Sequence, residues 1–113
     1  MTRKMIFKPV VVISMILALS VVNLADIRIR FARGRTSATV TGTIRAGGRV
    51  CYIAGARRGQ TLNAVLSSRS GKVNFLETGE TSYSFVVERG GDQTLCVDNV
   101  GGSTSYTLTV SIQ

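Results

Sequence analysis

The chain has 113 residues, with 14 lysine and arginine residues against 6 aspartate and glutamate residues, two cysteines, and neither histidine nor tryptophan. Without histidine, the Ser-His-Asp and Cys-His catalytic arrangements and the usual catalytic zinc sites are excluded. The composition therefore predicts a small basic protein that binds a partner and catalyses no reaction, and it assigns no catalytic residue, metal ligand or cofactor.

Residues 1–25 have the pattern of a bacterial export signal. An uncharged, largely apolar run that extends to Ala25 follows three basic residues, which are Arg3, Lys4 and Lys8. A basic segment followed by roughly 7–15 apolar residues is typical of a signal peptide, whereas a spanning helix needs about 20. We expect a signal helix, cleavage after Ser20 or Ala25, and a periplasmic or secreted product. The alternative is that the segment is not cleaved and anchors the domain to the membrane. Contact with a membrane is expected only in that case.

Residues 26–113 consist of short strands separated by glycine turns, with no helical period. Apolar and polar side chains alternate along each strand, as they do where one face is buried. The expected strands are 27–31, 38–44, 49–56, 61–67, 73–76, 82–88, 93–98 and 104–112. Seven to eight strands at this spacing predict an all-β domain, a single antiparallel β-sandwich of jelly-roll type. The glycine turns at 46–48 and 57–60 are expected to be hairpin tips.

The two cysteines are expected to form a disulfide. In an exported domain of this size, a lone pair of cysteines is more typical of a disulfide than of a metal or redox site. Cys51 and Cys96 each lie between apolar neighbours on a strand, so both thiols should leave the apolar face and meet on the outer face. We expect neighbouring strands with Cα atoms about 5 Å apart. Two free thiols are the alternative.

Three parts of the chain resemble exported bacterial β-sandwich domains. They are the stretch RTSATVTGTI at 35–44, the set Tyr52, Ala56 and Gly59-Gln60, and the stretch SYTLTV at 105–110. One similar group is the periplasmic inhibitors of g-type lysozyme; the other is the pre-peptidase C-terminal (PPC-like) domains of secreted proteases. The first resemblance implies a protein that inserts loops into the glycan cleft of a lysozyme-type hydrolase and blocks substrate access. The second implies an accessory domain.

Charge suggests another class of partner. Without the signal, 11 basic residues stand against 6 acidic ones, a net charge of +5. Clustered guanidinium groups favour phosphate and carboxylate, so an anionic envelope polymer or glycan is the alternative partner. The candidate binding loops are arginine-bearing turns and one glycine turn: Arg45, Arg49, Arg57, Arg58, Gly101 and Gly102. The alternative that these arginines form only a solvated surface, without a partner, stays open. Nucleic acid is disfavoured because no aromatic platform accompanies the charge.

The remaining polar clusters are assigned to turns. Glu77 and Glu80 are paired carboxylates of the kind that act on glycosidic bonds, but they lie on an expected hairpin loop. Asp92, Asp98 and Asn99 could offer oxygens to calcium, but the dense alternation of a calcium loop is missing, so they are expected to form turns. Five aromatic residues are expected in the core, since most of them share the parity of aliphatic neighbours on their strands: Tyr52, Phe75, Tyr83, Phe85 and Tyr106. The domain is expected to be a monomer.

Overall fold

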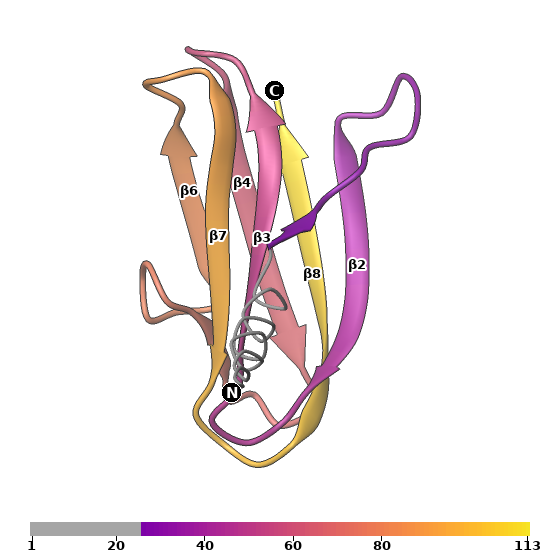
Figure 1. Cartoon of the computed structure of the whole chain (residues 1–113), viewed down its shortest axis with the longest axis vertical. Coiled ribbons are helices and arrows are strands. Elements are labelled where there is room, and N and C mark those ends of the chain that lie inside the picture. The colour runs from indigo at the N-terminus through magenta and orange to yellow at the C-terminus, as the bar shows by residue number, and fades with distance from the viewer. Residues whose placement is uncertain (1–25) are drawn as a thin grey trace, which may run out of the picture.

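The computed structural model describes residues 26–113, which form two four-stranded sheets packed face to face (Figure 1). The strands are β1 (Ile27–Arg28), β2 (Ser37–Ile44), β3 (Arg49–Ala56), β4 (Thr61–Ser68), β5 (Val73–Phe75), β6 (Ser82–Val86), β7 (Gly91–Asn99) and β8 (Thr104–Ile112). The predicted all-β sandwich of eight strands is confirmed. The predicted export signal lies outside the described residues. Within 26–113, no helix is long and apolar enough to cross a membrane.

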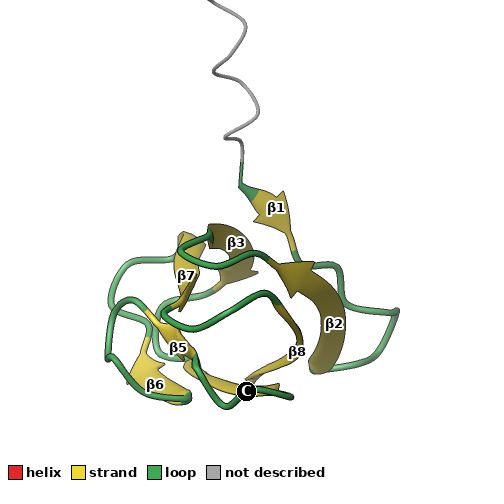
Figure 2. Cartoon of the chain, turned by 90° about the horizontal axis from the view of Figure 1, so that it is seen from below, coloured by secondary structure: helices red, strands yellow, loops and turns green. Residues whose placement is uncertain are grey.

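Every strand lies in the opposite sheet from the strand before it. Sheet A has the order β1-β3-β7-β5, and sheet B has the order β2-β8-β4-β6. Figure 2 shows the sandwich from its end. The antiparallel pairs β2–β8, β3–β7 and β4–β6 are nested, with β5 at the centre of the nest. Such nesting arises when one long antiparallel hairpin folds over onto itself while its two arms remain hydrogen-bonded to each other. This is the topology of a jelly roll. The structure therefore confirms the predicted topology class.

The prediction of hairpins was wrong. The turns at 46–48 and 57–60, the loop that holds Glu77 and Glu80, and the turn after Asn99 all carry the chain from one sheet to the other. A crossing between sheets needs the same tight glycine turn as a hairpin, so turn residues alone do not distinguish the two. The first strand also differs from the expected range 27–31, since β1 has two residues and pairs in parallel with β3.

The core lies between the sheets and is built from the inward-facing positions of strands β2 to β8. Its largest fully buried members are aliphatic residues of five segments and one phenylalanine: Leu62, Val73, Phe75, Val87, Leu95, Val97, Leu108 and Val110. Tyr52 and Tyr106 are buried among them, and Tyr83 and Phe85 pack against the margin. The prediction that the aromatic residues belong to the core is confirmed.

Two tyrosines join the sheets through their hydroxyl groups. The oxygens of Tyr52 on β3 and Tyr106 on β8 are 2.5 Å apart in the buried interior. Burial, together with this hydrogen bond, raises the pKa of Tyr52, so its hydroxyl stays protonated even at a pH at which an exposed tyrosine ionises. Gly42 on β2 lies opposite Tyr106, and a Cβ atom there would lie 3.0 Å from the Tyr106 hydroxyl oxygen. The missing side chain therefore leaves room for the Tyr106 ring.

Gly42→Ala should lower the free energy of unfolding by about 1–3 kcal/mol, because the added methyl group displaces the Tyr106 ring from its contact with Tyr52. Urea unfolding followed by circular dichroism measures the change. Gly102→Ala is the matched control, since nothing lies within 4 Å of a Cβ at that position. Equal midpoints for the two variants would contradict the proposed clash.

The predicted disulfide is present and lies between neighbouring strands. Cys51 and Cys96 are directly opposite in the β3–β7 pair, and their Cα atoms are 4.0 Å apart. The backbone of Cys96 turns away from β3, because its N–H donates to the Glu77 carboxylate and its carbonyl accepts from Leu76 N–H. The cysteines thus occupy a pair without mutual backbone hydrogen bonds, where opposing Cα atoms approach most closely. That position explains a separation shorter than the expected 5 Å or so.

Candidate binding surfaces

The predicted loop residues lie at opposite ends of the sandwich. Arg45 belongs to the β2–β3 connection, Arg49 is the first residue of β3, and Gly101 and Gly102 belong to the β7–β8 connection. The two connections are joined where Gly47 N–H donates to the Asn99 carbonyl over 3.1 Å. We call this the Asn99 end; it lies at the bottom of Figure 1. Arg57 and Arg58 belong to the β3–β4 turn at the other end, which we call the Arg57 end. The candidates therefore form two separate surfaces.

Asn99 holds the first of these ends together. Its side chain is buried, and its amide nitrogen lies 2.9 to 3.1 Å from the carbonyl oxygens of Ile44, Arg45 and Gly102. Its side-chain oxygen accepts from Gly101 N–H over 3.0 Å. One amide thereby fixes the turn after β2 against the turn after β7. The sequence predicts only a turn for Asn99, because two of its three carbonyl partners, those of Ile44 and Arg45, lie more than 50 residues away along the chain.

The charges at the Asn99 end are partly neutralised. Arg49 forms two bonds with the Asp98 carboxylate, 2.6 Å and 3.1 Å long, from the facing position on β7. The hydrogen bond and charge of Asp98 raise the pKa of Arg49. Gly101 is needed for close packing, since a Cβ there would lie 2.7 Å from the Lys72 Cβ. The absence of a side chain at Gly101 therefore lets the aliphatic part of the Lys72 side chain, from the β4–β5 turn, pack at this end.

The Arg57 end is built on a rigid turn. Arg57 N–H donates to the side-chain oxygen of Gln60 over 2.7 Å, and Gly59 takes a positive φ of 91°. Gly59 N–H donates to the Val87 carbonyl, and Val87 N–H donates to the Gln60 carbonyl, each over 2.8 Å. These bonds tie the turn to the chain that follows β6. The Gly59-Gln60 pair thus has a structural role, and it fixes the backbone from which Arg57 projects.

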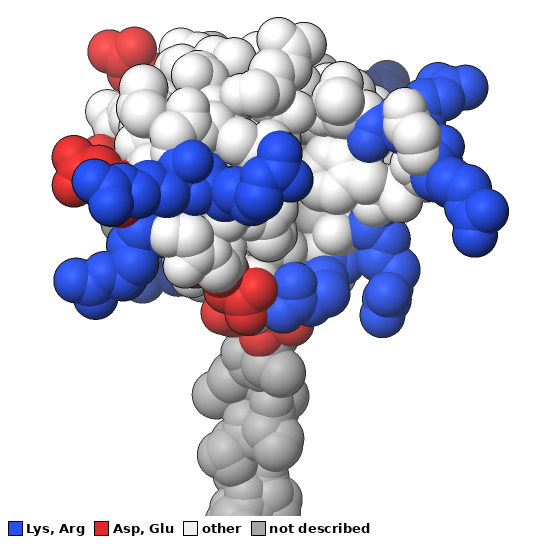
Figure 3. Space-filling model, turned by 90° about the horizontal axis from the view of Figure 1, so that it is seen from above, with Lys and Arg blue, Asp and Glu red and all other residues white. Residues whose placement is uncertain are grey.

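Basic side chains project from the Arg57 end. Figure 3 looks at this end and shows lysine and arginine side chains at several points of the edge and also across part of the middle of the face. A cleft of about 210 Å³ lies here, with Arg35 and Arg57 among its lining residues beside Phe31 and Gln60. The neighbouring connection between β6 and β7 contributes Arg89, which is exposed. This end therefore presents several arginines on fixed backbone.

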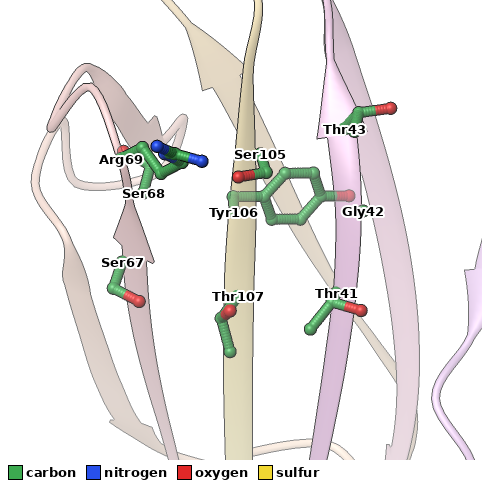
Figure 4. Close-up of a pocket in the computed structure, with 9 residues that line it drawn as sticks. All are labelled: Thr41, Gly42, Thr43, Ser67, Ser68, Arg69, Ser105, Tyr106 and Thr107. Atoms are coloured by element: carbon green, nitrogen blue, oxygen red, sulfur yellow. The ribbon is translucent and has the colours of Figure 1, made fainter.

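A groove lies on the outer face of sheet B. It has a volume of about 590 Å³ and is lined by residues of β2, β4 and β8 together with Arg69 (Figure 4). Serine and threonine supply most of its lining, and no acidic residue takes part. None of the binding residues predicted from the sequence lies in this surface. Within 26–113, no group of three or more His, Cys, Asp or Glu side chains is placed to hold a metal ion.

Among solved structures, the fold is similar to that of periplasmic lysozyme inhibitors. Aeromonas hydrophila PliG, a periplasmic lysozyme inhibitor of g-type lysozyme, superposes with a TM-score of 0.69 at 21% identity, over 78% of this chain and 96% of its own. The Salmonella Typhimurium PliG superposes with a TM-score of 0.62 at 18% identity, and a mutant of the Escherichia coli PliG with a TM-score of 0.61 at 17% identity. Each of these two matches covers 78% of this chain and 97% of the other. No protein-family model and no curated protein sequence matches the chain. The resemblance to the inhibitor group is confirmed at the level of the fold, and the PPC-like resemblance stays a prediction.

Proposed function

We propose that this chain is an exported, periplasmic, non-catalytic inhibitor of a g-type lysozyme. The observation that supports this most is the extent of the structural likeness, which spans nearly the whole of each PliG structure and not a fragment of it. The absence of histidine is consistent with a binding role, because the common triads and zinc sites need that residue. A fold alone does not define a function, so the contact surface must be argued from its residues.

The Arg57–Gln60 turn is the proposed contact with the lysozyme. Glycosidases place a pair of carboxylates in the glycan cleft, and an arginine that enters such a cleft pairs with them through its guanidinium fork. Arg57 and Arg58 are exposed at the tip of a turn that the Gln60 side chain and the Val87 backbone hold in place. A turn that is already ordered loses little conformational freedom on binding. The contact is local, so the net charge of +5 contributes little to it.

A lysis assay tests this function. The oxidised protein should slow the clearing of a peptidoglycan suspension by a g-type lysozyme and leave a c-type lysozyme unaffected. Arg57→Ala combined with Arg58→Ala should raise the inhibitory concentration about 30-fold or more, as expected when a buried charge pair loses one partner. Arg45→Ala removes a charge from the other end of the sandwich and should change the inhibitory concentration less than about threefold. Full clearing at a large molar excess of the unmodified protein would overturn the proposal.

Binding of an anionic envelope polymer is the second candidate. Within residues 26–113, only Arg28 and Arg49 among the 11 basic side chains form ion pairs, with Asp92 and Asp98. The unpaired remainder favours a polyanion. Polymer binding should weaken steeply as salt rises, because counterions are released along a charged chain, whereas a local inhibitory contact should change little. Sedimentation with purified envelope polymer at two salt concentrations separates the candidates.

A further inference from the structure

The groove on the outer face of sheet B continues toward the Asn99 end. A second hollow of about 570 Å³ adjoins the first, and the two share Thr43, Arg69 and Ser105 in their lining. The second hollow extends over Ser70, Ser103 and Thr104, which lie in or beside the turns of that end. Together the hollows form one open channel, which we call the hydroxyl groove. Its size is in the range of sites that bind small ligands or segments of a polymer.

The strand register arranges the lining of the hydroxyl groove in two rows. Thr41 on β2 faces Thr107 on β8, which in turn faces Ser67 on β4. Thr43 faces Ser105, and Arg69 N–H donates to the Ser105 carbonyl at the end of the second row. Figure 4 shows both rows, with the Arg69 guanidinium extending toward Ser105. Neighbouring strands are about 4.8 Å apart, and alternate residues of a strand about 6.7 Å, so the rows form a regular grid of hydroxyl groups.

These side chains are free to bind. Within residues 26–113, the hydroxyl groups of Thr41, Thr43, Ser67, Ser105 and Thr107 make no side-chain hydrogen bond to the protein. Arg69 likewise forms no ion pair there, in contrast to Arg28 and Arg49. Below the grid, the ring of Tyr106 fills the space beneath Gly42 and makes a solid floor. The groove thus offers several donors and acceptors and one positive charge on a rigid sheet.

We propose that the hydroxyl groove binds a glycan strand that carries carboxylate groups. Threonine and serine hydroxyls both donate and accept, as the hydroxyl groups of a sugar require. The Arg69 guanidinium is suited to a carboxylate, with which it forms a charge-assisted fork. No acidic side chain lines the groove to repel an anion. The groove lies on a sheet face, whereas Arg57 and Arg58 lie on a turn at the far end, so the glycan site is distinct from the proposed inhibitory contact.

Titration of the ¹⁵N-labelled, oxidised protein with a galacturonic acid hexamer tests the proposal. Amide shifts should concentrate at 41–43, 67–69 and 105–107, and the fully methyl-esterified hexamer should bind about tenfold more weakly or worse because it lacks the charge. Arg69→Gln should cause a similar loss. Arg45→Gln, which removes the same charge from the same end but outside the groove, should cost less than about twofold.

Two further variants examine the hydroxyl grid. Thr107→Val removes the central hydroxyl at nearly constant volume and should weaken binding several-fold, whereas Thr39→Val on the same face, outside the groove, should not. Equal losses for Arg69→Gln and Arg45→Gln, shifts confined to the Arg57 end, or no shifts at all would each overturn the proposal. Inhibition of a g-type lysozyme should be unchanged in Arg69→Gln and Thr107→Val, so the failure of one function is distinguishable from the failure of the other.

Discussion

Removal of the Cys51–Cys96 disulfide should lower the free energy of unfolding by about 4 kcal/mol. The bond closes a loop across 45 residues, and the chain-entropy estimate for a loop of that length gives this value. This loss is a large fraction of the free energy of unfolding of a typical domain, which is about 5–15 kcal/mol. A domain of this size also has only a small core to offset the loss. The double variant Cys51→Ala, Cys96→Ala should therefore unfold at a much lower urea concentration than the oxidised protein.

The reduced protein is the matched comparison for that variant. Reduction removes the same covalent constraint without changing the sequence, so both forms should show the same loss and the same dependence on urea, while the oxidised form differs. The strands β3 and β7 should still pair, because the apolar residues beside the cysteines remain in the core. A loss below about 1 kcal/mol in both forms would show that the unfolded chain is already compact enough to make the constraint unimportant.

The strands were predictable because their signal is local. Alternation along 49–56 and 104–112 reports which side chains are buried, and β3 and β8 have those bounds in the structure. Alternation does not report the partner strand. The turn at 46–48 is therefore predicted as a hairpin tip, although β2 pairs with β8, whose residues lie 60 or more positions away along the chain. The parity of Cys51 and Cys96 predicted their disulfide without the topology, since both had to leave the apolar face.

The surfaces were less predictable because they combine residues from distant strands. Arg49 was selected for its charge, but Asp98 neutralises it from the facing strand. The hydroxyl groove joins positions 41–43, 67–69 and 105–107, and only the register of β2, β8 and β4 brings them together. The outward threonines of the segment TVTGT were a visible signal. Their significance depended on the neighbours of β2, which a single sequence does not provide.

Asn99→Ala should lower the free energy of unfolding by about 2–4 kcal/mol, even though sequence reasoning assigns the residue only to a turn. The change removes four hydrogen bonds and leaves the buried carbonyl of Ile44 without its side-chain donor. The turn after β2 and the turn after β7 should also loosen, which faster amide exchange at Gly47 and Gly101 would reveal. Asn63→Ala, on the exposed face of β4, is the control; it removes only the exposed hydrogen bond that the Ser84 hydroxyl donates and should lower the free energy of unfolding by about 1 kcal/mol or less.

Asn99→Asp tests the same contact through charge. At neutral pH its carboxylate would face the carbonyl oxygens that now accept from the Asn99 amide, so it should be less stable than Asn99→Ala by about 1 kcal/mol or more. That environment raises the pKa of the introduced carboxyl above its value of about 3.9 in the unfolded chain. The loss of stability caused by the charged carboxylate is therefore absent below about pH 3.9 and reappears as the pH rises. Urea unfolding at pH 3.5 and pH 7 should show the gap between the two variants closing in acid; a gap that stays constant would mean that water reaches the side chain and that the contact is not buried.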